Sequence, residues 1–80
     1  MVDVIFDHFF KKKFQKIKSN TIKEKIIKQL SKIKENPEIG KPMRFVRKGT
    51  RELYIPPFRL SYRMDGDAIY ILDLYHKEAR

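Results

Sequence analysis

The segment from residue 51 to residue 80 constrains the fold most, because its apolar and polar residues alternate as in half-buried β-strands. Two turn signals divide it, Pro56-Pro57 and Asp65-Gly66-Asp67. In the middle part, arginines occupy the positions between the apolar residues. We therefore predict a meander of three strands with one apolar face and one arginine-bearing face, over residues 51–55, 58–64 and 68–75.

The first half of the chain predicts one short strand and two amphipathic helices. Residues 2–6 are rich in β-forming side chains, and the residues after them have the period of a helix that ends near Ser19. A second helix should begin at a capping box formed by Thr21 and Glu24 and should end at Asn36-Pro37. The apolar stripes expected to face the core are Phe10, Phe14 and Ile17, then Ile22, Ile26, Ile27, Leu30 and Ile33.

The element order predicted from these patterns is β-α-α-β-β-β, in an α+β fold with two antiparallel N-terminal helices. Residues 41–50 form a basic connection, with or without a short strand. A chain of 80 residues supports one small core, so residues 1–80 are expected to form a single domain.

The charge balance predicts an anionic partner. The chain has 19 lysines and arginines against 10 acidic residues, for a formal net charge of +9. Nucleic acid, an acidic protein or a membrane surface would each be attracted by this charge. Many of the lysines in the first half have a simpler explanation, because lysines commonly solvate the outer faces of helices.

The composition also excludes several classes of protein. The chain has no cysteine and two histidines, so we expect no disulfide, no metal site and no cofactor. No segment approaches the roughly 20 apolar residues that span a bilayer, and the N-terminal residues do not resemble a secretory signal. A cytoplasmic protein that does not enter the membrane is expected.

The turns decide which side chains share the polar face. A two-residue link at Pro56-Pro57 would pair Tyr54 with Arg59. For the next turn we favour a three-residue loop at Asp65-Gly66-Asp67, because it keeps Asp73 out of the core and beside Arg59. Tyr75 and Lys77 would then join the polar face, whereas a two-residue turn would bring His76 beside Arg59 instead of Lys77.

The polar face suits a phosphodiester, because guanidinium groups match phosphate oxygens and tyrosine rings can stack on bases. Arg59 and Arg63 occupy it, between tyrosines on neighbouring strands. Cross-strand pairing of Arg59 with Asp73 and Glu52, on an ordinary solvated face, is an equally good interpretation of the pattern alone.

Four segments together resemble the RelE/ParE superfamily of type II toxins. They are K-I-K-E-N-P-E-I-G-K-P-M at residues 32–43, R-E-L-Y-I at 51–55, F-R-L-S-Y at 58–62 and I-Y-I-L-D-L-Y-H-K at 69–77. The resemblance implies two helices packed on one face of a small, mainly antiparallel sheet. In the RelE branch it also implies an mRNA endonuclease that works on the ribosome without a metal, attacks with the ribose 2′-hydroxyl and inhibits translation until an antitoxin neutralises it.

The resemblance also assigns candidate site residues. Arg59 would stabilise the charge of the transition state, and Glu52 would be the general base or an ion-pair partner of the arginines. The general acid would be His76 or Lys77. The remaining candidates would bind the RNA backbone or stack on bases, and they are Arg44, Arg47, Lys48, Arg51, Arg63, Tyr54 and Tyr75.

Two departures from the family leave other functions open. The lysine pair of one branch is represented by Thr50 and Glu52, and no tyrosine follows the last strand. A ParE-like toxin that inhibits DNA gyrase and an inert RNA-binding relative are therefore alternatives to the endonuclease. In each toxin reading, the expected partner is an acidic antitoxin whose amphipathic helix covers apolar surface; the nuclease also requires the ribosome and mRNA.

Overall fold

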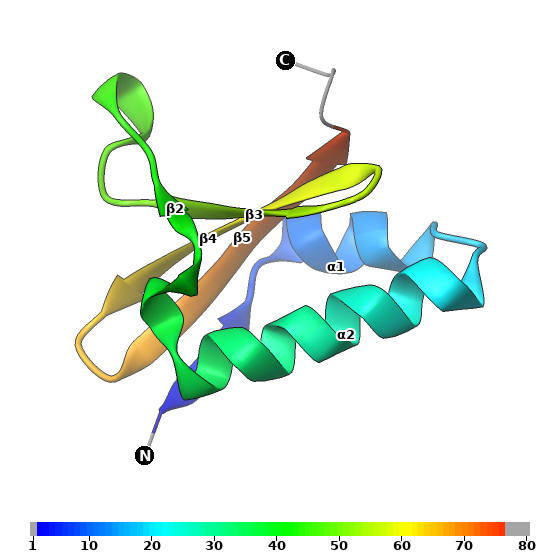
Figure 1. The fold of residues 1–80 in the computed structure, drawn as a ribbon, viewed down its shortest axis with the longest axis horizontal. Helices are drawn as coiled ribbons and strands as arrows, with labels where there is room; N and C mark the ends of the chain where they lie inside the picture. Colours follow the sequence, from blue (N-terminus) through cyan, green and yellow to red (C-terminus); the bar gives the residue numbers. More distant parts are fainter. Residues whose placement is uncertain (1, 77–80) are drawn as a thin grey trace.

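This computed structural model describes residues 2–76. Their strands form one sheet of five strands in the spatial order β1-β5-β4-β3-β2 (Figure 1). β1 is parallel to β5, and the other neighbouring strands are antiparallel. The elements are β1 (Asp3–Phe6), α1 (His8–Gln15), α2 (Asn20–Glu35), the 3-10 turn η1 (Pro37–Ile39), β2 (Lys41–Pro42), the 3-10 turn η2 (Phe45–Arg47), β3 (Arg51–Ile55), β4 (Phe58–Asp65) and β5 (Ala68–His76). The predicted order is confirmed, and the basic connection adds the short strand β2.

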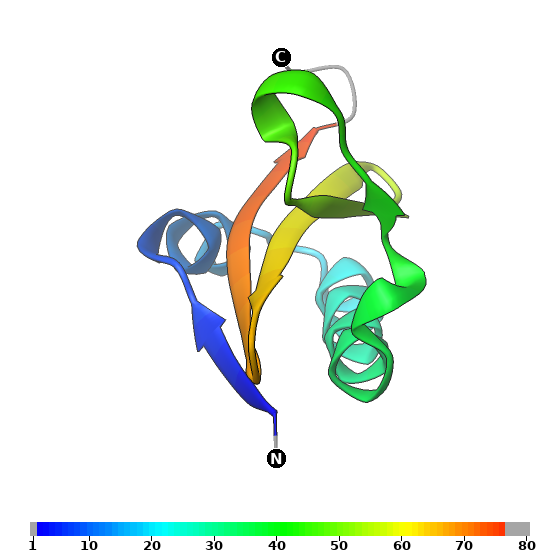
Figure 2. The same ribbon diagram turned by 90° about the vertical axis from the view of Figure 1, so that its left-hand side faces the viewer.

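The two helices run in opposite directions against the sheet, while the loop of residues 43–50 lies away from them (Figures 1 and 2). Ile27 is the one predicted stripe residue that points to solvent, with 53% of its surface exposed. Its neighbour Ile26 is fully buried, and successive helix residues point roughly 100° apart, so Ile27 lies at the edge of the buried stripe. The buried core consists of Phe10, Ile26, Ile33, Ile55, Leu60, Tyr62, Ile69, Ile71 and Leu74.

Both helices are capped by side chains upstream of their first turns. Asp7 accepts a hydrogen bond from the Phe9 amide at 2.9 Å, and Ser19 accepts one from the Ile22 amide at 3.2 Å. The predicted capping box at Thr21 is therefore wrong, because Ser19 offers the same cap chemistry two residues earlier and starts α2 there. No helix in the described part of the chain is long and apolar enough to cross a membrane.

The strand registers confirm the first predicted turn and correct the second. Tyr54 faces Arg59 across β3 and β4, as predicted. Asp65 pairs with Ala68 across a two-residue turn, so the three-residue loop is wrong. A register shift between Ser61 and Tyr62 then restores the expected alternation further along β5.

With the two-residue turn and this shift, Asp73 lies opposite Ser61, and not opposite Arg59 as the three-residue loop predicted. Its carboxylate accepts a hydrogen bond from the Lys13 ammonium of α1 at 2.8 Å, and so stays out of the core. Tyr75 shares the polar face with Arg59, as predicted, but it lies directly opposite Arg59, where the favoured register had placed Asp73.

The Tyr62 hydroxyl connects the sheet to the turn that follows α2. It donates to the carbonyl oxygen of Pro37 at 2.7 Å and accepts from the Gly40 amide at 2.8 Å. A Cβ atom at Gly40 would lie 2.5 Å from this hydroxyl oxygen, so only glycine leaves room for the contact. Burial raises the pKa of the Tyr62 phenol above its ordinary value of 10.0, although the Gly40 hydrogen bond and the Arg51 charge oppose the rise.

Tyr62→Phe should lower the free energy of unfolding by roughly 1–3 kcal/mol, because two backbone groups lose their hydrogen-bond partner. Since the phenol pKa is raised in the folded state, its stabilising effect should persist up to the ordinary pKa of 10.0 and be lost at higher pH. Urea unfolding of both proteins should therefore show the stability difference narrowing above that pH. A difference that is small at neutral pH, or constant into the alkaline range, would contradict this assignment.

Candidate functional site

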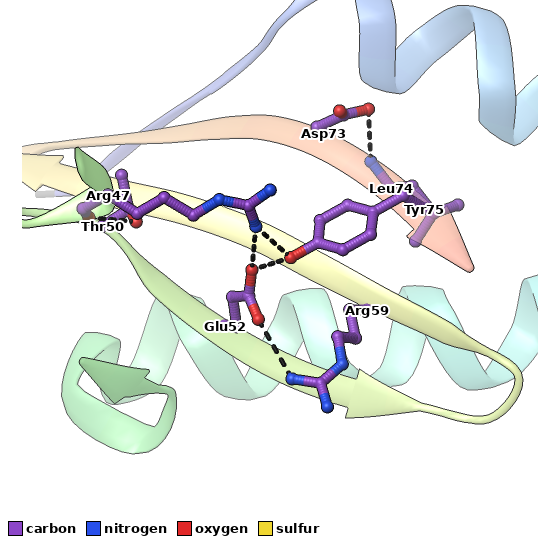
Figure 3. Close-up of polar contacts among 7 residues, drawn as sticks. All are labelled: Arg47, Thr50, Glu52, Arg59, Asp73, Leu74 and Tyr75. Atoms are coloured by element: carbon purple, nitrogen blue, oxygen red, sulfur yellow. Dashed lines mark hydrogen bonds and ion pairs between the residues drawn. The ribbon is translucent and has the colours of Figure 1, made fainter. Parts of the chain in front are cut away.

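A buried carboxylate organises the sheet face that points away from the helices (Figure 3). Glu52 on β3 is only 5% exposed. Its oxygens accept hydrogen bonds from Arg47 at 2.8 Å, from Arg59 at 3.3 Å and from the Tyr75 hydroxyl. Because breaking a buried ion pair costs roughly 3–5 kcal/mol, this arrangement holds the two guanidinium groups in place. We call these four residues the Glu52 cluster.

The strand registers bring three members of the cluster together. Arg59 on β4 and Tyr75 on β5 are cross-strand partners. Glu52 lies on β3, which pairs with the other edge of β4. Alternation along each strand turns all three side chains away from the apolar core. The fourth member, Arg47, comes from η2 and lies over the Tyr75 ring, with its guanidinium carbon 5.1 Å from the ring centre.

The loop of residues 43–50 is fastened at its base and carries Arg47 to the sheet. The Met43 amide donates to the Thr50 carbonyl at 3.0 Å, and the Thr50 hydroxyl donates to the Arg47 carbonyl at 2.7 Å. A pocket of about 350 Å³ lies between this loop and the sheet. It is lined by Met43, Arg44, Phe45, Val46, Arg47, Glu52, Arg59 and Tyr75.

The pocket favours an anion that can accept several hydrogen bonds. The Nε atom of Arg59 is buried and has no hydrogen-bond partner among the described residues. A buried donor of this kind is costly unless an acceptor reaches it. Arg47 remains about half exposed, with 47% of its side chain accessible. A phosphate group entering the pocket would meet two guanidinium groups and the phenol of Tyr75.

Four of the predicted RNA-binding residues lie outside both the Glu52 cluster and the lining of its pocket. Arg51 donates to the carbonyl oxygen of Gly40 at 2.8 Å and so supports the turn after α2. Arg63 lies over the Tyr70 ring at 4.4 Å, towards the β4–β5 turn. Tyr54 is half exposed on β3, and Lys48 is exposed on the loop.

The structure separates His76 from the Glu52 cluster. Its ring packs against Phe58 with the ring centres 4.8 Å apart, on the side of the sheet that the helices cover. There it lines an apolar pocket of about 500 Å³ together with Ile17 and Ile22. His76 therefore does not lie beside Arg59, although the turn has two residues, and Lys77 lies outside the described residues.

Sequence reasoning missed the apolar part of the site. Phe45 and Val46 line the same pocket as Arg59, although they belong to no strand or long helix. The available signal was an aromatic and an aliphatic residue between cations in a segment without periodicity. Among residues 2–76, no three histidine or acidic side chains are grouped so that they could hold a metal ion.

Comparison with known proteins identifies the family. The model described as "ParE toxin of type II toxin-antitoxin system, parDE" matches residues 4–80. No curated protein matches the chain.

Several solved structures share the fold. The toxin of the Escherichia coli RelBE complex has a TM-score of 0.80 at 19% identity, covering 99% of this chain and 100% of that one. RelBE2 of Mycobacterium tuberculosis gives 0.82 at 24% identity, covering 95% and 98%. A ParDE complex of Pseudomonas aeruginosa gives 0.80 at 19% identity, covering 98% of each chain. The resemblance to the RelE/ParE superfamily is confirmed, and the chain belongs to the ParE toxin family of type II toxin-antitoxin systems.

Proposed function

We propose that this toxin is an endoribonuclease that cleaves mRNA on the ribosome, with the Glu52 cluster as its active site. The observation that carries the proposal is the convergence of Arg47, Arg59 and Tyr75 on one buried carboxylate beside a pocket. Two guanidinium groups in a partly desolvated pocket can stabilise charge that develops on a phosphate. The ion pairs with Glu52 hold both in place before the substrate arrives.

The cluster contains the two groups that the reaction needs to move protons. The Glu52 carboxylate would accept the proton of the ribose 2′-hydroxyl while the 2′-oxygen forms a bond to phosphorus. The bond from phosphorus to the 5′-oxygen would break, and this oxygen would take the proton of the Tyr75 phenol. Because the Tyr75 hydroxyl is hydrogen-bonded to Glu52, the protonated carboxyl group can return its proton to the phenolate. The products would be a 2′,3′-cyclic phosphate and a 5′-hydroxyl end.

Arg59→Ala should reduce mRNA cleavage by about 100-fold to 1,000-fold, as expected for the loss of a preorganised charge donor. Primer extension on translating ribosomes would measure the cleavage. Arg63→Ala is the matched control, because it removes an arginine from the same strand but outside the cluster, and it should lower cleavage by no more than a few-fold. Since Glu52 loses a partner in Arg59→Ala, thermal unfolding must show that the variant is folded. Equal losses in both variants would contradict the assignment.

Glu52→Gln and Tyr75→Phe should each reduce cleavage by about 100-fold to 10,000-fold, the range for general acid and base groups. The double variant should be hardly slower than either single variant, because the two residues share one proton circuit. His76→Gln should retain nearly full cleavage, since His76 lies on the other side of the sheet. Independent losses that multiply in the double variant, or a large loss in His76→Gln, would overturn the circuit.

Inhibition of DNA gyrase is the second candidate function, because the matching family is described as ParE toxins and the sequence resemblance implies this activity for a ParE-like toxin. A gyrase inhibitor needs no proton circuit, so its toxicity should survive Glu52→Gln. Intact mRNA on translating ribosomes, together with inhibited DNA supercoiling, would select this function over the nuclease. Intact mRNA with unaffected supercoiling would instead support the inert RNA-binding relative.

The apolar pocket beside His76 suits the amphipathic helix of an acidic antitoxin. Ile17, Ile22 and Phe58 give it an apolar floor, and the exposed lysines at its rim carry positive charge. An antitoxin helix with an apolar stripe and carboxylates on its flanks would match both features. The solved RelBE complexes of Escherichia coli and Mycobacterium tuberculosis are toxin-antitoxin complexes, which supports such a partner.

Reversing the charge at the rim, with Lys16→Glu and Lys18→Glu together, should weaken antitoxin binding roughly tenfold at low salt. The difference in affinity between the variant and the wild type should shrink as salt is added, because salt screens the attraction between the wild-type lysines and the antitoxin carboxylates. Calorimetric titration at low and high salt would measure both effects. Lys32→Glu, an exposed lysine of α2 outside this pocket, is the control and should bind normally. The same loss in the control would show that only overall charge matters.

A further inference from the structure

The tip of the 43–50 loop exposes two apolar side chains that neither the core nor the proposed chemistry uses. Phe45 is 88% exposed and Val46 is 99% exposed. Cations stand on both sides of this pair, at Arg44, Arg47 and Lys48. An exposed ring between cations offers single-stranded nucleic acid a stacking surface and partners for its phosphates.

The backbone holds the Phe45 ring in this position. Phe45 has a φ of 60°, in the left-handed region that residues other than glycine and asparagine rarely adopt. The turn is closed by the Lys48 amide, which donates to the Phe45 carbonyl at 3.0 Å. Such unfavourable conformations persist where the surrounding structure imposes them, and they gather at functional sites.

Phe45 lines two pockets at the loop. One is the pocket of about 350 Å³ that contains Arg59. The other, of about 600 Å³, is lined by Phe45 together with Lys41 and Arg44. A nucleic-acid strand with one phosphate at Arg59 could therefore cross the ring and bring a neighbouring phosphate to the cations of the second pocket.

We propose that Phe45 stacks on an unpaired nucleobase next to the phosphate held by Arg47 and Arg59. The inference rests on the proposed function and adds a base-binding subsite to it. The observations favour RNA over a protein partner, because one ring suffices to bind one base face. The core of a stable protein interface would need a larger apolar area than two side chains provide.

Phe45→Asn removes the ring and keeps the fold, because asparagine tolerates the left-handed conformation. Fluorescence anisotropy with a labelled short single-stranded RNA, made uncleavable by 2′-O-methyl riboses, would measure binding. The affinity should fall by about 5-fold to 150-fold, the range for one stacked base. The same RNA with abasic sites in place of its bases should bind the variant and the wild type equally. Phe9→Asn, which removes a phenylalanine that is 64% exposed on α1, is the matched control and should bind normally.

Phe45→Trp gives a direct signal, since the chain has no tryptophan of its own. Its fluorescence should be quenched by the RNA with bases and unchanged by the abasic RNA. If Phe45→Asn binds both RNAs like the wild type while Arg59→Ala loses affinity, the stacking inference is wrong and the proposed active site stands. If neither RNA binds, and only an acidic antitoxin peptide changes the fluorescence of Phe45→Trp, then both the inference and the RNA-cleaving function fall.

Discussion

The register shift between β4 and β5 decides which side chains share each face of the sheet. Ile69 and Ile71 are buried near the turn, and Leu74 is buried beyond the shift, although a regular strand would turn Ile71 and Leu74 to opposite faces. The extra residue in β5 lets both reach the core. The same shift turns Tyr75 to the polar face beside Arg59, so one local irregularity satisfies the core and builds the site.

The site in turn depends on a carboxylate that would be unfavourable without its partners. Glu52 is almost fully buried, and it is compatible with folding because two guanidinium groups and a phenol surround it. In return, the carboxylate fixes groups that would otherwise sample many rotamers on the surface. Arg47 gains most from this, because none of the loop residues 43–50 belongs to the buried core of the described residues.

The sequence predicted the parts of the fold that follow from regular alternation. Pro56-Pro57 set the β3–β4 register. Helical spacing identified the residues of the two helices that face the core, and Ile27 was the one wrong choice. The β4–β5 shift is visible in the sequence, since the apolar residues change from odd-numbered to even-numbered positions between Ile71 and Leu74. The prediction of a regular strand does not include this change. The ion pair of Arg47 with Glu52 could not be predicted, because a loop without periodicity gives no register from which to place its side chains.

The charges of the Glu52 cluster also match the proposed reaction. With Glu52 ionised, the two guanidinium groups leave one net positive charge, which balances the single negative charge of a phosphodiester. If Glu52 takes the 2′-hydroxyl proton as proposed, its negative charge would disappear and the cluster would gain a second net positive charge. The phosphorane would gain its second negative charge in the same step, so the cluster would bind the transition state more strongly than the substrate. A lysine that stayed protonated at position 52 would hold the positive charge constant and would offer no such increase.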